Sequence, residues 1–539
     1  MSKIASYLAT HLRGEVLSSA GVREAFSTDG SVLKCQPILA AYPYDTSDVR
    51  KIAHFSWQLA QKGHVLPLTA RGSGSSLVGA AIGSGAIISL QTHFKNIFEV
   101  DTKQKLVRLQ PGVTITALRQ AMHTHGLDVS IDSSNPSSTV GGAVSNNTYG
   151  ERALKYGDAA QWVDQLEVVL SNGDILQTER LSKRQLSKKK GLNGFEGEIY
   201  RKLDALIDDN EGVIEGLAQK QTSAGYAITK VKDKKGHFDL TPLIAGAQGT
   251  LGIITEIILR LDVHHPHKEV VVAILNSVDN IDAVVNSVLK YTPDKIEFVD
   301  GVSIERSGAD LKEVLPDDEP DLVPQGILFI ELSDAGRKAK GKAKKIAKLV
   351  EKLGHQTASS AGDIESAGEI WQIYHRLQTS LAQSGDEHKV ASPIVEDALL
   401  PPGEVPHFIE AAHDLAKKHR TKFVFSAHIG TGVVHAHTQI DLKNLTDRNK
   451  IDKLIEEYYA LVIKHDGGTA GEYGEGRLHV SQNNAQFSEE ELELFAKIKK
   501  IFDIHGIFNP GVKIADLKDA AKLDEHYVNG KFADNLPRL

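Results

Sequence analysis

Two segments in the second half of the chain carry the side chains best suited to metal or acid–base chemistry. One holds His428, His435 and His437 around two glycines, and a later glycine-rich segment holds Glu472. If the first segment forms a strand after a glycine turn, His435 and His437 project to the same face. Two imidazoles and a carboxylate suit a transition metal that keeps positions open for a substrate. Histidines spaced in this way are also often polar surface residues, so both interpretations stay open.

A glycine- and serine-rich loop early in the chain has the composition of a phosphate-binding loop. It follows an apolar stretch, residues 64–68, that is predicted to be a strand. Glycines let backbone N–H groups approach a phosphate, serine hydroxyls add donors, and an arginine adds a fixed positive charge. Leu77 replaces the third glycine of a nicotinamide fingerprint, and the loop lacks the Gly-Lys-Ser/Thr ending of a nucleoside-triphosphate site. The residues assigned to the ligand are Arg71, Gly72, Ser73, Gly74, Ser75, Ser76 and Gly79.

A second loop of similar composition lies downstream and precedes a predicted strand at residues 166–170. Two loops that could each bind phosphate, each next to a strand, are suited to one long cofactor that carries a pyrophosphate. A dinucleotide is the natural candidate. The residues assigned to this second loop are Pro136, Ser137, Ser138, Gly141, Gly142, Ser145, Asn146 and Gly150.

Both loops, together with residues 246–253 and 508–511, resemble the flavin-binding family that includes vanillyl-alcohol oxidase, D-lactate dehydrogenase and D-2-hydroxyglutarate dehydrogenase. The resemblance implies FAD as the cofactor. It also implies that the first loop binds the FAD pyrophosphate, that the second lines the rest of the dinucleotide, and that Gly252 and Ile253 lie near the adenine end. Asn509 is assigned to the cofactor as well. The first loop contains no histidine, the residue to which covalent members attach their flavin, so non-covalent FAD is expected.

The resemblance to the D-2-hydroxyacid dehydrogenase branch also gives the polar segments a role. It implies that His428, His435 and Glu472 bind a divalent metal, usually zinc. Such a metal would bind the hydroxyl and carboxylate oxygens of the substrate and lower the pKa of the hydroxyl as a Lewis acid.

The chain departs from this branch at the position of the catalytic base. Relatives have a histidine after the metal-binding glutamate, whereas this chain has Tyr473. A tyrosine has an ordinary pKa of about 10 and is a poor base at neutral pH. His437 stands where relatives place an asparagine or arginine that touches substrate, and a histidine pKa of about 6.5 suits a base. His437 is therefore proposed as the base, with Tyr473 as the other candidate.

Three positions bear on substrate binding. Relatives have a carboxylate-binding arginine three residues after a tryptophan, but here Trp371 is followed at that spacing by Tyr374, with Arg376 two residues later. Lys389 falls where relatives have a substrate-binding lysine, although a surface cation is an equal interpretation. Tyr374, Arg376 and Lys389 are the candidate substrate contacts.

Together these features predict oxidation of a D-2-hydroxy acid, similar to D-lactate, by hydride transfer from the α-carbon to flavin N5. The electron acceptor would be a quinone, an electron-transfer protein or dioxygen. One alternative is a non-redox enzyme that forms a flavin adduct, as in the related alkyl-glycerone-phosphate synthases. Another is a flavin-binding protein that has lost catalysis, for which Tyr374 and Tyr473 are the evidence.

The elements that must position these residues predict an α+β fold. Its first part is a PCMH-type FAD-binding domain of two subdomains, and its second is an antiparallel cap sheet with helices on one face. The predicted order is an N-terminal helix and linker (1–36), the FAD-binding domain (37–264), the cap (265–449), a helical segment that returns to the flavin (450–515) and a tail (516–539).

Composition narrows the functional classes. The formal net charge of −8 argues against nucleic acid as the main partner, and the single cysteine, Cys35, excludes an internal disulfide or an all-cysteine iron–sulfur site. No apolar run reaches the roughly 20 residues that span a bilayer, and no signal peptide is recognised, so a cytoplasmic location is expected. Two lysine-rich stretches, 183–190 and 337–352, are either solvated helix faces or a contact with the inner membrane surface or an acidic electron acceptor.

Overall fold

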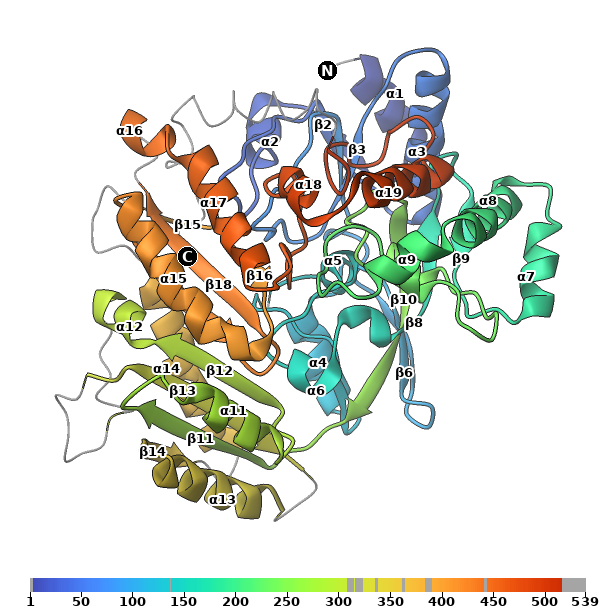
Figure 1. Ribbon diagram of the computed structural model, residues 1–539. Helices are drawn as coiled ribbons and strands as arrows, with labels where there is room; N and C mark the ends of the chain where they lie inside the picture. The colour runs from blue at the N-terminus through green and yellow to red at the C-terminus, as the bar shows by residue number, and fades with distance from the viewer. Residues whose placement is uncertain are drawn as a thin grey trace. The chain divides into compact units, whose positions relative to one another are not determined.

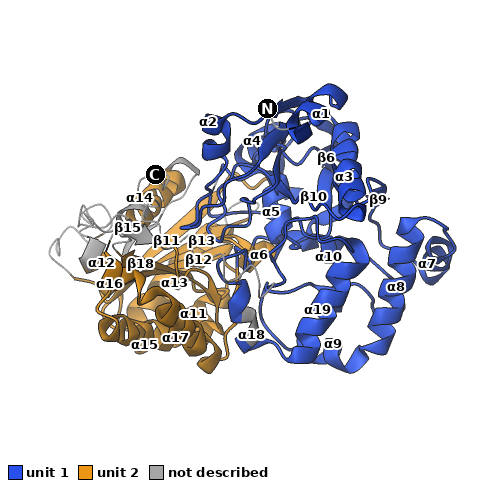
Figure 2. Cartoon of the chain, turned by 90° about the horizontal axis from the view of Figure 1, so that it is seen from above, with its two compact units in different colours: residues 1–148, 158–262, 472–536 blue, residues 149–157, 263–471, 537–539 orange. Residues whose placement is uncertain are grey.

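The chain forms two compact units, which Figure 2 colours separately. The structure is a computed structural model that describes residues 3–515 except 136, 308–314, 316–322, 335–337, 361–363, 383–389 and 441–443. Among the described residues, unit 1 comprises 3–148, 158–262 and 472–515, and unit 2 comprises 149–157 and 263–471. Each unit is therefore assembled from segments that are far apart in the sequence. The predicted helical segment 450–515 is shared between the units, and the predicted tail lies outside the described residues.

The first sheet of unit 1 has four strands in the order β1-β2-β4-β3, of which Figure 1 labels β2 and β3. Strands β2, β4 and β3 are parallel, and β1 is antiparallel to β2. The strand predicted at 64–68 instead starts at Leu68, because Pro67 has no N–H to donate to a sheet. The strands are β1 (Glu15–Leu17), β2 (Leu39–Tyr42), β3 (Leu68–Arg71) and β4 (Ala86–Ser89).

The second sheet of unit 1 is antiparallel, with the order β5-β6-β10-β8-β9 and β7 paired to β10. The long strand β10 lies at its centre and pairs with both β6 and β8. Its strands are β5 (Ile97–Asp101), β6 (Leu106–Leu109), β7 (Leu127–Val129), β8 (Val163–Val169), β9 (Ile175–Gln177) and β10 (Ile253–Val263). Two sheets in one unit agree with the two predicted subdomains of the FAD-binding domain.

The helices of unit 1 lie in the segments that connect or flank its strands. Helix α3 connects β2 to β3, and it starts after Asp45, whose side chain accepts a hydrogen bond from Asp48 N. The helices are α1 (Lys3–His11), α2 (Ala20–Ala25), α3 (Thr46–Gln61), α4 (Ile115–His123), α5 (Val140–Asn146), α7 (Lys183–Lys190), α8 (Phe195–Asp209), α9 (Glu211–Leu217), α10 (Thr241–Ile244), α18 (Asn483–Gln486) and α19 (Glu489–Phe502).

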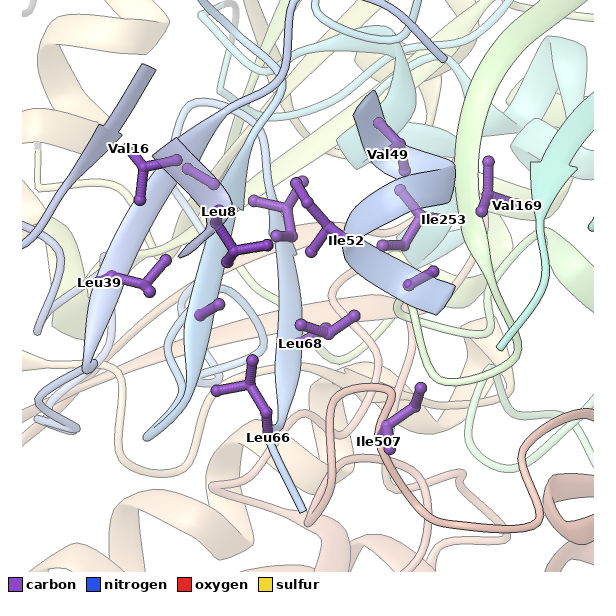
Figure 3. Close-up of a cluster of buried hydrophobic side chains, with 14 of the residues drawn as sticks. Leu8, Val16, Leu39, Val49, Ile52, Leu66, Leu68, Val169, Ile253 and Ile507 are labelled. Atoms are coloured by element: carbon purple, nitrogen blue, oxygen red, sulfur yellow. The ribbon is translucent and has the colours of Figure 1, made fainter. Parts of the chain in front are cut away.

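A hydrophobic cluster joins the parts of unit 1 that come from distant segments (Figure 3). Leu39 and Leu68 contribute from the four-stranded sheet, Ile52 from α3, Ile253 from β10 and Ile507 from the returning segment. All five side chains are buried. Because each fully buried aliphatic side chain contributes about 1.5–3 kcal/mol, this cluster fixes the start of β10 and the returning segment against the first sheet.

Unit 2 is built on one antiparallel sheet of eight strands, in the order β14-β11-β13-β12-β17-β18-β15 with β16 paired to β18. The antiparallel sheet predicted for the cap is therefore present. Its strands are β11 (Lys268–Leu275), β12 (Lys295–Asp300), β13 (Gly326–Ser333), β14 (Gln356–Ser360), β15 (Val390–Ser392), β16 (Ala398–Leu399), β17 (Phe423–His428) and β18 (Val433–Ile440).

The prediction that helices cover only one face of this sheet is wrong. Trp371 and Tyr374 of α14 pack against one face, which includes Phe329 of β13, while the alternate residue Leu328 is also fully buried. Figures 1 and 2 both show α14 on one side of the sheet and α11 and α15 on the other. The helices of unit 2 are α6 (Ala153–Tyr156), α11 (Ile281–Leu289), α12 (Gly301–Ser307), α13 (Lys338–Lys352), α14 (Ile364–Ala382), α15 (Val405–Lys418), α16 (Leu445–Arg448) and α17 (Ile451–Lys464).

Charged residues lie on the buried face beneath α14, where they are paired. Lys295 lies opposite Glu331 in the register of β12 and β13, and its Nζ is 2.8 Å from Glu151 Oε2 and 3.2 Å from the centre of the Trp371 ring. Glu331 Oε1 is 3.1 Å from Lys268 Nζ. These partners, drawn from segments distant in sequence, compensate for the burial of charge.

Glu331→Gln is expected to destabilise unit 2 more at pH 7 than at pH 3. Burial raises the pKa of Glu331, but Lys268 and Lys295 outweigh burial and lower the pKa from its usual 4.5 to about 2. The ionised carboxylate therefore stabilises the fold above pH 4.5, and this contribution is lost as the pH falls from 4.5 towards 2. Chemical denaturation should give a deficit of about 1–3 kcal/mol at pH 7 that shrinks at pH 3. An equal deficit at both pH values would contradict this assignment.

Both lysine-rich stretches form helices, α7 and α13. In α7, Lys189 and Lys190 pair with Glu196 and Asp204 at 2.6 and 2.5 Å. In α13, Ala343, Ile346 and Val350 are buried, so the lysines lie on the remaining face. Within the described part of the chain, no helix combines the length and the apolar character that crossing a bilayer requires.

Candidate functional site

The two glycine-rich loops lie against each other in unit 1. Ser75 Oγ is 3.1 Å from Ser73 Oγ and 3.3 Å from Ser138 Oγ of the second loop. At Gly72, an added Cβ would lie 2.1 Å from Thr139 Oγ1, so only glycine allows the loops to approach this closely. The clustered hydroxyls and accessible backbone form a set of donors that fits the pyrophosphate of FAD.

The second loop leads into α5, and the turn at residues 246–252 packs beside it. Thr139 caps α5 by accepting a hydrogen bond from Gly142 N at 3.2 Å. Gln248 N donates to Ser145 O at 2.8 Å, and Gln248 Nε2 donates to Asn146 Oδ1 at 3.1 Å. Three of the four segments assigned to FAD from the sequence are therefore neighbours within unit 1.

Several residues assigned to FAD also have structural roles. The Arg71 guanidinium donates from Nη1 to the backbone oxygens of Thr28 and Ala81 at 2.8 and 3.2 Å, which ties the start of the loop to its far end and to the N-terminal segment. Ser76 Oγ accepts from Ala80 N at 3.2 Å, and the Ile253 side chain lies in the hydrophobic cluster of Figure 3. Their contacts with FAD remain predictions.

The other residues assigned to FAD differ in exposure and in the unit to which they belong. Ser137 is exposed and bonded to Asn135, and Gly141 packs on Pro111. Gly150 belongs to unit 2. Pro136 and the candidate substrate residue Lys389 lie outside the described residues.

Asn509 connects three segments of unit 1 through its side chain. Nδ2 donates to Ala80 O at 2.9 Å and to Gln248 O at 2.8 Å. Oδ1 accepts from Thr69 Oγ1 at 3.2 Å and from Arg477 Nη2 at 2.8 Å. The amide thus holds the first loop, the 246–252 turn and the segment after Glu472 together.

Asn509→Ala is expected to lower the stability of unit 1 by about 2–4 kcal/mol and to reduce its retention of FAD. The truncation leaves several buried donors and acceptors without partners, and each such loss costs about 1–3 kcal/mol. The ratio of flavin to protein absorbance after gel filtration measures retention. Full retention and an unchanged thermal midpoint would show that these bonds contribute little.

His428 and His435 form a close, buried pair in unit 2. His428 ends β17 and His435 lies in β18, and the register pairs His428 with Val433 and Ser426 with His435, so both imidazoles project from the same face. Their Nε2 atoms are 3.1 Å apart and the rings meet edge to face. The strand and turn predicted from the sequence are confirmed.

The turn between β17 and β18 depends on Gly432. Its φ is +87°, and an added Cβ would lie 1.8 Å from Leu400 O. Thr431 N and Gly432 N both donate to His428 O at 2.9 Å, which closes the turn directly after the first histidine. The glycine therefore sets the register that brings the two imidazoles together.

Each imidazole is anchored by a buried carboxylate. His428 Nδ1 is 2.6 Å from Glu297 Oε2, and His435 Nδ1 is 2.6 Å from Glu396 Oε1. This pattern assigns the proton to Nδ1 in both rings and leaves both Nε2 lone pairs facing each other. Such an arrangement is repulsive unless a proton or a metal ion lies between them. Two nitrogen ligands of a tetrahedral zinc, each about 2.0–2.1 Å from it, are about 3.3 Å apart, so the pair fits a divalent metal.

The third predicted ligand, Glu472, belongs to unit 1 and directly follows Gly471, where the segment of unit 2 ends. Its carboxylate accepts hydrogen bonds from Ser134 N at 2.9 Å, Ser134 Oγ at 2.7 Å and Thr148 Oγ1 at 3.2 Å. These hydrogen bonds orient the buried carboxylate. Its participation in a metal site remains a prediction.

The two candidate bases lie in different units. His437 follows His435 on the same face of β18 and is half-buried. Burial lowers the pKa of His437, with a further lowering by His435 and an opposing effect of Glu396, so its ring is neutral at neutral pH. Tyr473 is half-buried in unit 1, where its backbone oxygen accepts from Gln248 Nε2 at 2.9 Å.

The candidate substrate residues of α14 point in different directions. Tyr374 is 3% exposed, and its hydroxyl donates to Glu297 Oε2 at 2.9 Å. Burial and the nearby Glu297 raise the pKa of Tyr374 well above its usual value, so it remains a donor. Arg376 is exposed. The geometry thus favours a positioning role for Tyr374, and substrate contact by either residue remains a prediction.

Sequence reasoning missed Glu297. In β12, Lys295 and Glu297 alternate with Ile296 and Phe298, a pattern that normally indicates one solvated face. The sequence shows only that Glu297 stands two residues after Lys295 in a predicted strand. This pattern does not identify Glu297 as a partner of His428 unless the order of β12 and β17 in the sheet is known.

Comparisons with known proteins agree with this architecture. The profile of the family described as FAD binding domain matches residues 37–179, and the profile described as FAD linked oxidases, C-terminal domain, matches residues 264–512. The chain is 26% identical to D-2-hydroxyglutarate dehydrogenase of Pseudomonas putida over 93% of its length, but spans about half (50%) of that relative. It is also 26% identical to glycolate oxidase subunit GlcD of Bacillus subtilis, with 94% of each chain covered.

Solved structures show the same fold. The structure of p-cresol methylhydroxylase with substrate bound superposes with a TM-score of 0.66 at 14% identity, covering 96% of this chain and 97% of that one. The PCMH-type fold predicted from the sequence is therefore confirmed. The chain therefore consists of an FAD binding domain at residues 37–179 followed by the C-terminal domain of the FAD linked oxidases at residues 264–512.

Proposed function

We propose that this protein is an FAD-dependent dehydrogenase that oxidises a D-2-hydroxy acid to the 2-oxo acid with the help of a divalent metal, expected to be zinc. The observation that carries the proposal is the buried pair of His428 and His435, with both Nδ1 atoms anchored and the Nε2 atoms 3.1 Å apart. Relatives named D-2-hydroxyglutarate dehydrogenase and glycolate oxidase subunit GlcD support the substrate class.

The proposed reaction removes a hydride and a proton from the substrate. FAD, when bound in unit 1, would take the hydride from the α-carbon. The metal, when held by His428, His435 and Glu472, would polarise the hydroxyl and orient the carboxylate of the substrate. His437 would accept the hydroxyl proton on its neutral ring, since burial lowers its pKa.

Tyr473 is the alternative proton acceptor, and the oxidising equivalents would pass to a quinone, an electron-transfer protein or dioxygen. An unperturbed tyrosine hydroxyl holds its proton at neutral pH. His437 is therefore the better base, unless a cation lowers the pKa of Tyr473.

A steady-state assay with an artificial dye acceptor tests the proposal. Purified protein is mixed with D- and L-isomers of 2-hydroxy acids that range from lactate to 2-hydroxyglutarate. We expect turnover with one or more D-acids, little turnover with the matching L-acids, and loss of turnover after metal chelation that zinc restores. Equal turnover of both isomers, or none with any acid, would overturn the substrate class. Turnover that survives complete metal removal would overturn the metal step alone.

A further inference from the structure

Two carboxylates of unit 2, Glu297 and Glu396, lie within hydrogen-bond distance of the Nδ1 atoms of His428 and His435, on the sides of the rings away from the paired Nε2 atoms. We infer that they are positioning residues that hold His428 and His435 as a ligand pair already formed before metal binds, and that they set its affinity for a divalent ion. This inference rests on the proposed function, since it deepens the metal site named there.

Glu297 reaches His428 across neighbouring strands. The register of β12 and β17 pairs Phe298 with Ala427, which places Glu297 opposite His428 on the same face. Glu297 is 0% exposed, and Oε1 has no hydrogen-bond partner among the described residues. Both hydrogen bonds to this carboxylate go to Oε2, from His428 at 2.6 Å and from Tyr374 at 2.9 Å. Such a buried carboxyl group depends strongly on the imidazole N–H.

Glu396 contacts His435 at a position where β18 has no described strand partner on that edge. Strand β18 pairs with β15 at Thr438 and with β16 at Val434, and neither strand pairs with Ala436 between them. Glu396 Oε2 accepts from Ala436 N at 3.1 Å, while Oε1 accepts from His435 at 2.6 Å. The backbone oxygen of Glu396 accepts from Tyr459 Oη at 2.7 Å. The carboxylate is thus fixed by the same strand that carries its histidine.

The charge of this arrangement favours a divalent ion. Two carboxylic groups flank the histidine pair, each 2.6 Å from an imidazole Nδ1, and a divalent cation matches two acidic groups better than a single shared proton does. Each carboxylate also withdraws the Nδ1 proton towards itself, which increases the electron density at Nε2 and strengthens metal binding. Lys295 also interacts electrostatically with Glu297, but its ion pair is with Glu151 at 2.8 Å, and Lys268 pairs with Glu331 at 3.1 Å.

The first test measures the affinity of the FAD-loaded full chain for zinc by competition with a chromophoric chelator. Glu297→Gln and Glu396→Gln remove one charge each and keep an acceptor at the same place. We expect each to weaken zinc binding about 10–100-fold. Glu331→Gln is the matched control, because it removes a buried carboxylate from the same face without touching a histidine, and it should bind zinc within about twofold of the parent. Unchanged affinity in both site variants, or an equal loss in the control, would overturn the inference.

The second test reads the imidazole protons directly and needs no metal. Nitrogen-15 spectra of the metal-free protein, labelled at histidine and assigned with His428→Asn and His435→Asn, should show Nδ1 protonated in both rings. If the parent binds no zinc but both Nδ1 atoms are protonated, the metal step of the proposed function fails and the positioning role stands. Unprotonated Nδ1 in either ring would overturn the positioning role, whatever the metal content.

Discussion

His435→Ala is expected to remove zinc from the protein and to slow flavin reduction by the substrate at least about 10³-fold, while FAD stays bound. The variant removes one of two imidazoles whose Nε2 atoms lie 3.1 Å apart, and it leaves Glu396 buried without its 2.6 Å partner. A Lewis acid stabilises the developing negative charge by several kcal/mol, and about 1.4 kcal/mol corresponds to a tenfold change in rate. The residues assigned to FAD, apart from Gly150, that the structure describes lie in unit 1, so flavin content should not change.

Stopped-flow absorbance under anaerobic conditions gives the reduction rate, and elemental analysis of the same sample gives the zinc content. His413→Ala is the matched control, since His413 is also buried in unit 2 and pairs with Asp300 at 3.2 Å. The control should keep both zinc and the parental rate. Loss of FAD from His435→Ala, or a normal rate without zinc, would contradict the assignment of His435.

His437→Asn is expected to slow flavin reduction about 10²–10⁴-fold without loss of zinc or FAD. Asparagine has no titratable group and is smaller than histidine, so the change should remove the base with little disturbance of β18. Burial lowers the pKa of His437 and keeps the parental ring in the form that accepts a proton. Single-turnover rates with the D-acid found in the dye assay provide the measurement.

Tyr473→Phe serves as the comparison for this variant. If His437 is the base, the phenylalanine variant should reduce flavin within about tenfold of the parental rate, far above His437→Asn. The reverse ranking would move the role to Tyr473.

The hairpin that carries the histidines could be predicted because its signals are local. Glycines at 430 and 432 indicate a turn, and strand alternation then places His435 and His437 on one face, which β18 confirms. The two glycine-rich loops were also recognisable, since close backbone approach requires glycine at positions such as Gly72.

The role of Glu297 could not be predicted because it depends on strand order and on burial. Glu297 acts on His428 only because β12 lies beside β17, although 131 residues separate them in the sequence. The alternating charges of β12 indicated a solvated face, whereas α14 covers that face and the partners Glu151 and His428 compensate for burial. The predicted start of the strand at residue 64 was wrong for a local reason. The strand begins at Leu68 because Pro67 has no N–H to donate, and a pattern of apolar residues does not show this restriction.

The most direct test of the central claim is the visible spectrum of the purified, zinc-assayed protein under anaerobic conditions, before and after one equivalent of a D-2-hydroxy acid. We expect the oxidised flavin band to bleach, with one 2-oxo acid formed per flavin, and we expect chelated protein to bleach only after zinc is restored. A flavin band that no D-2-hydroxy acid bleaches, in protein that retains both FAD and zinc, would contradict the dehydrogenase assignment.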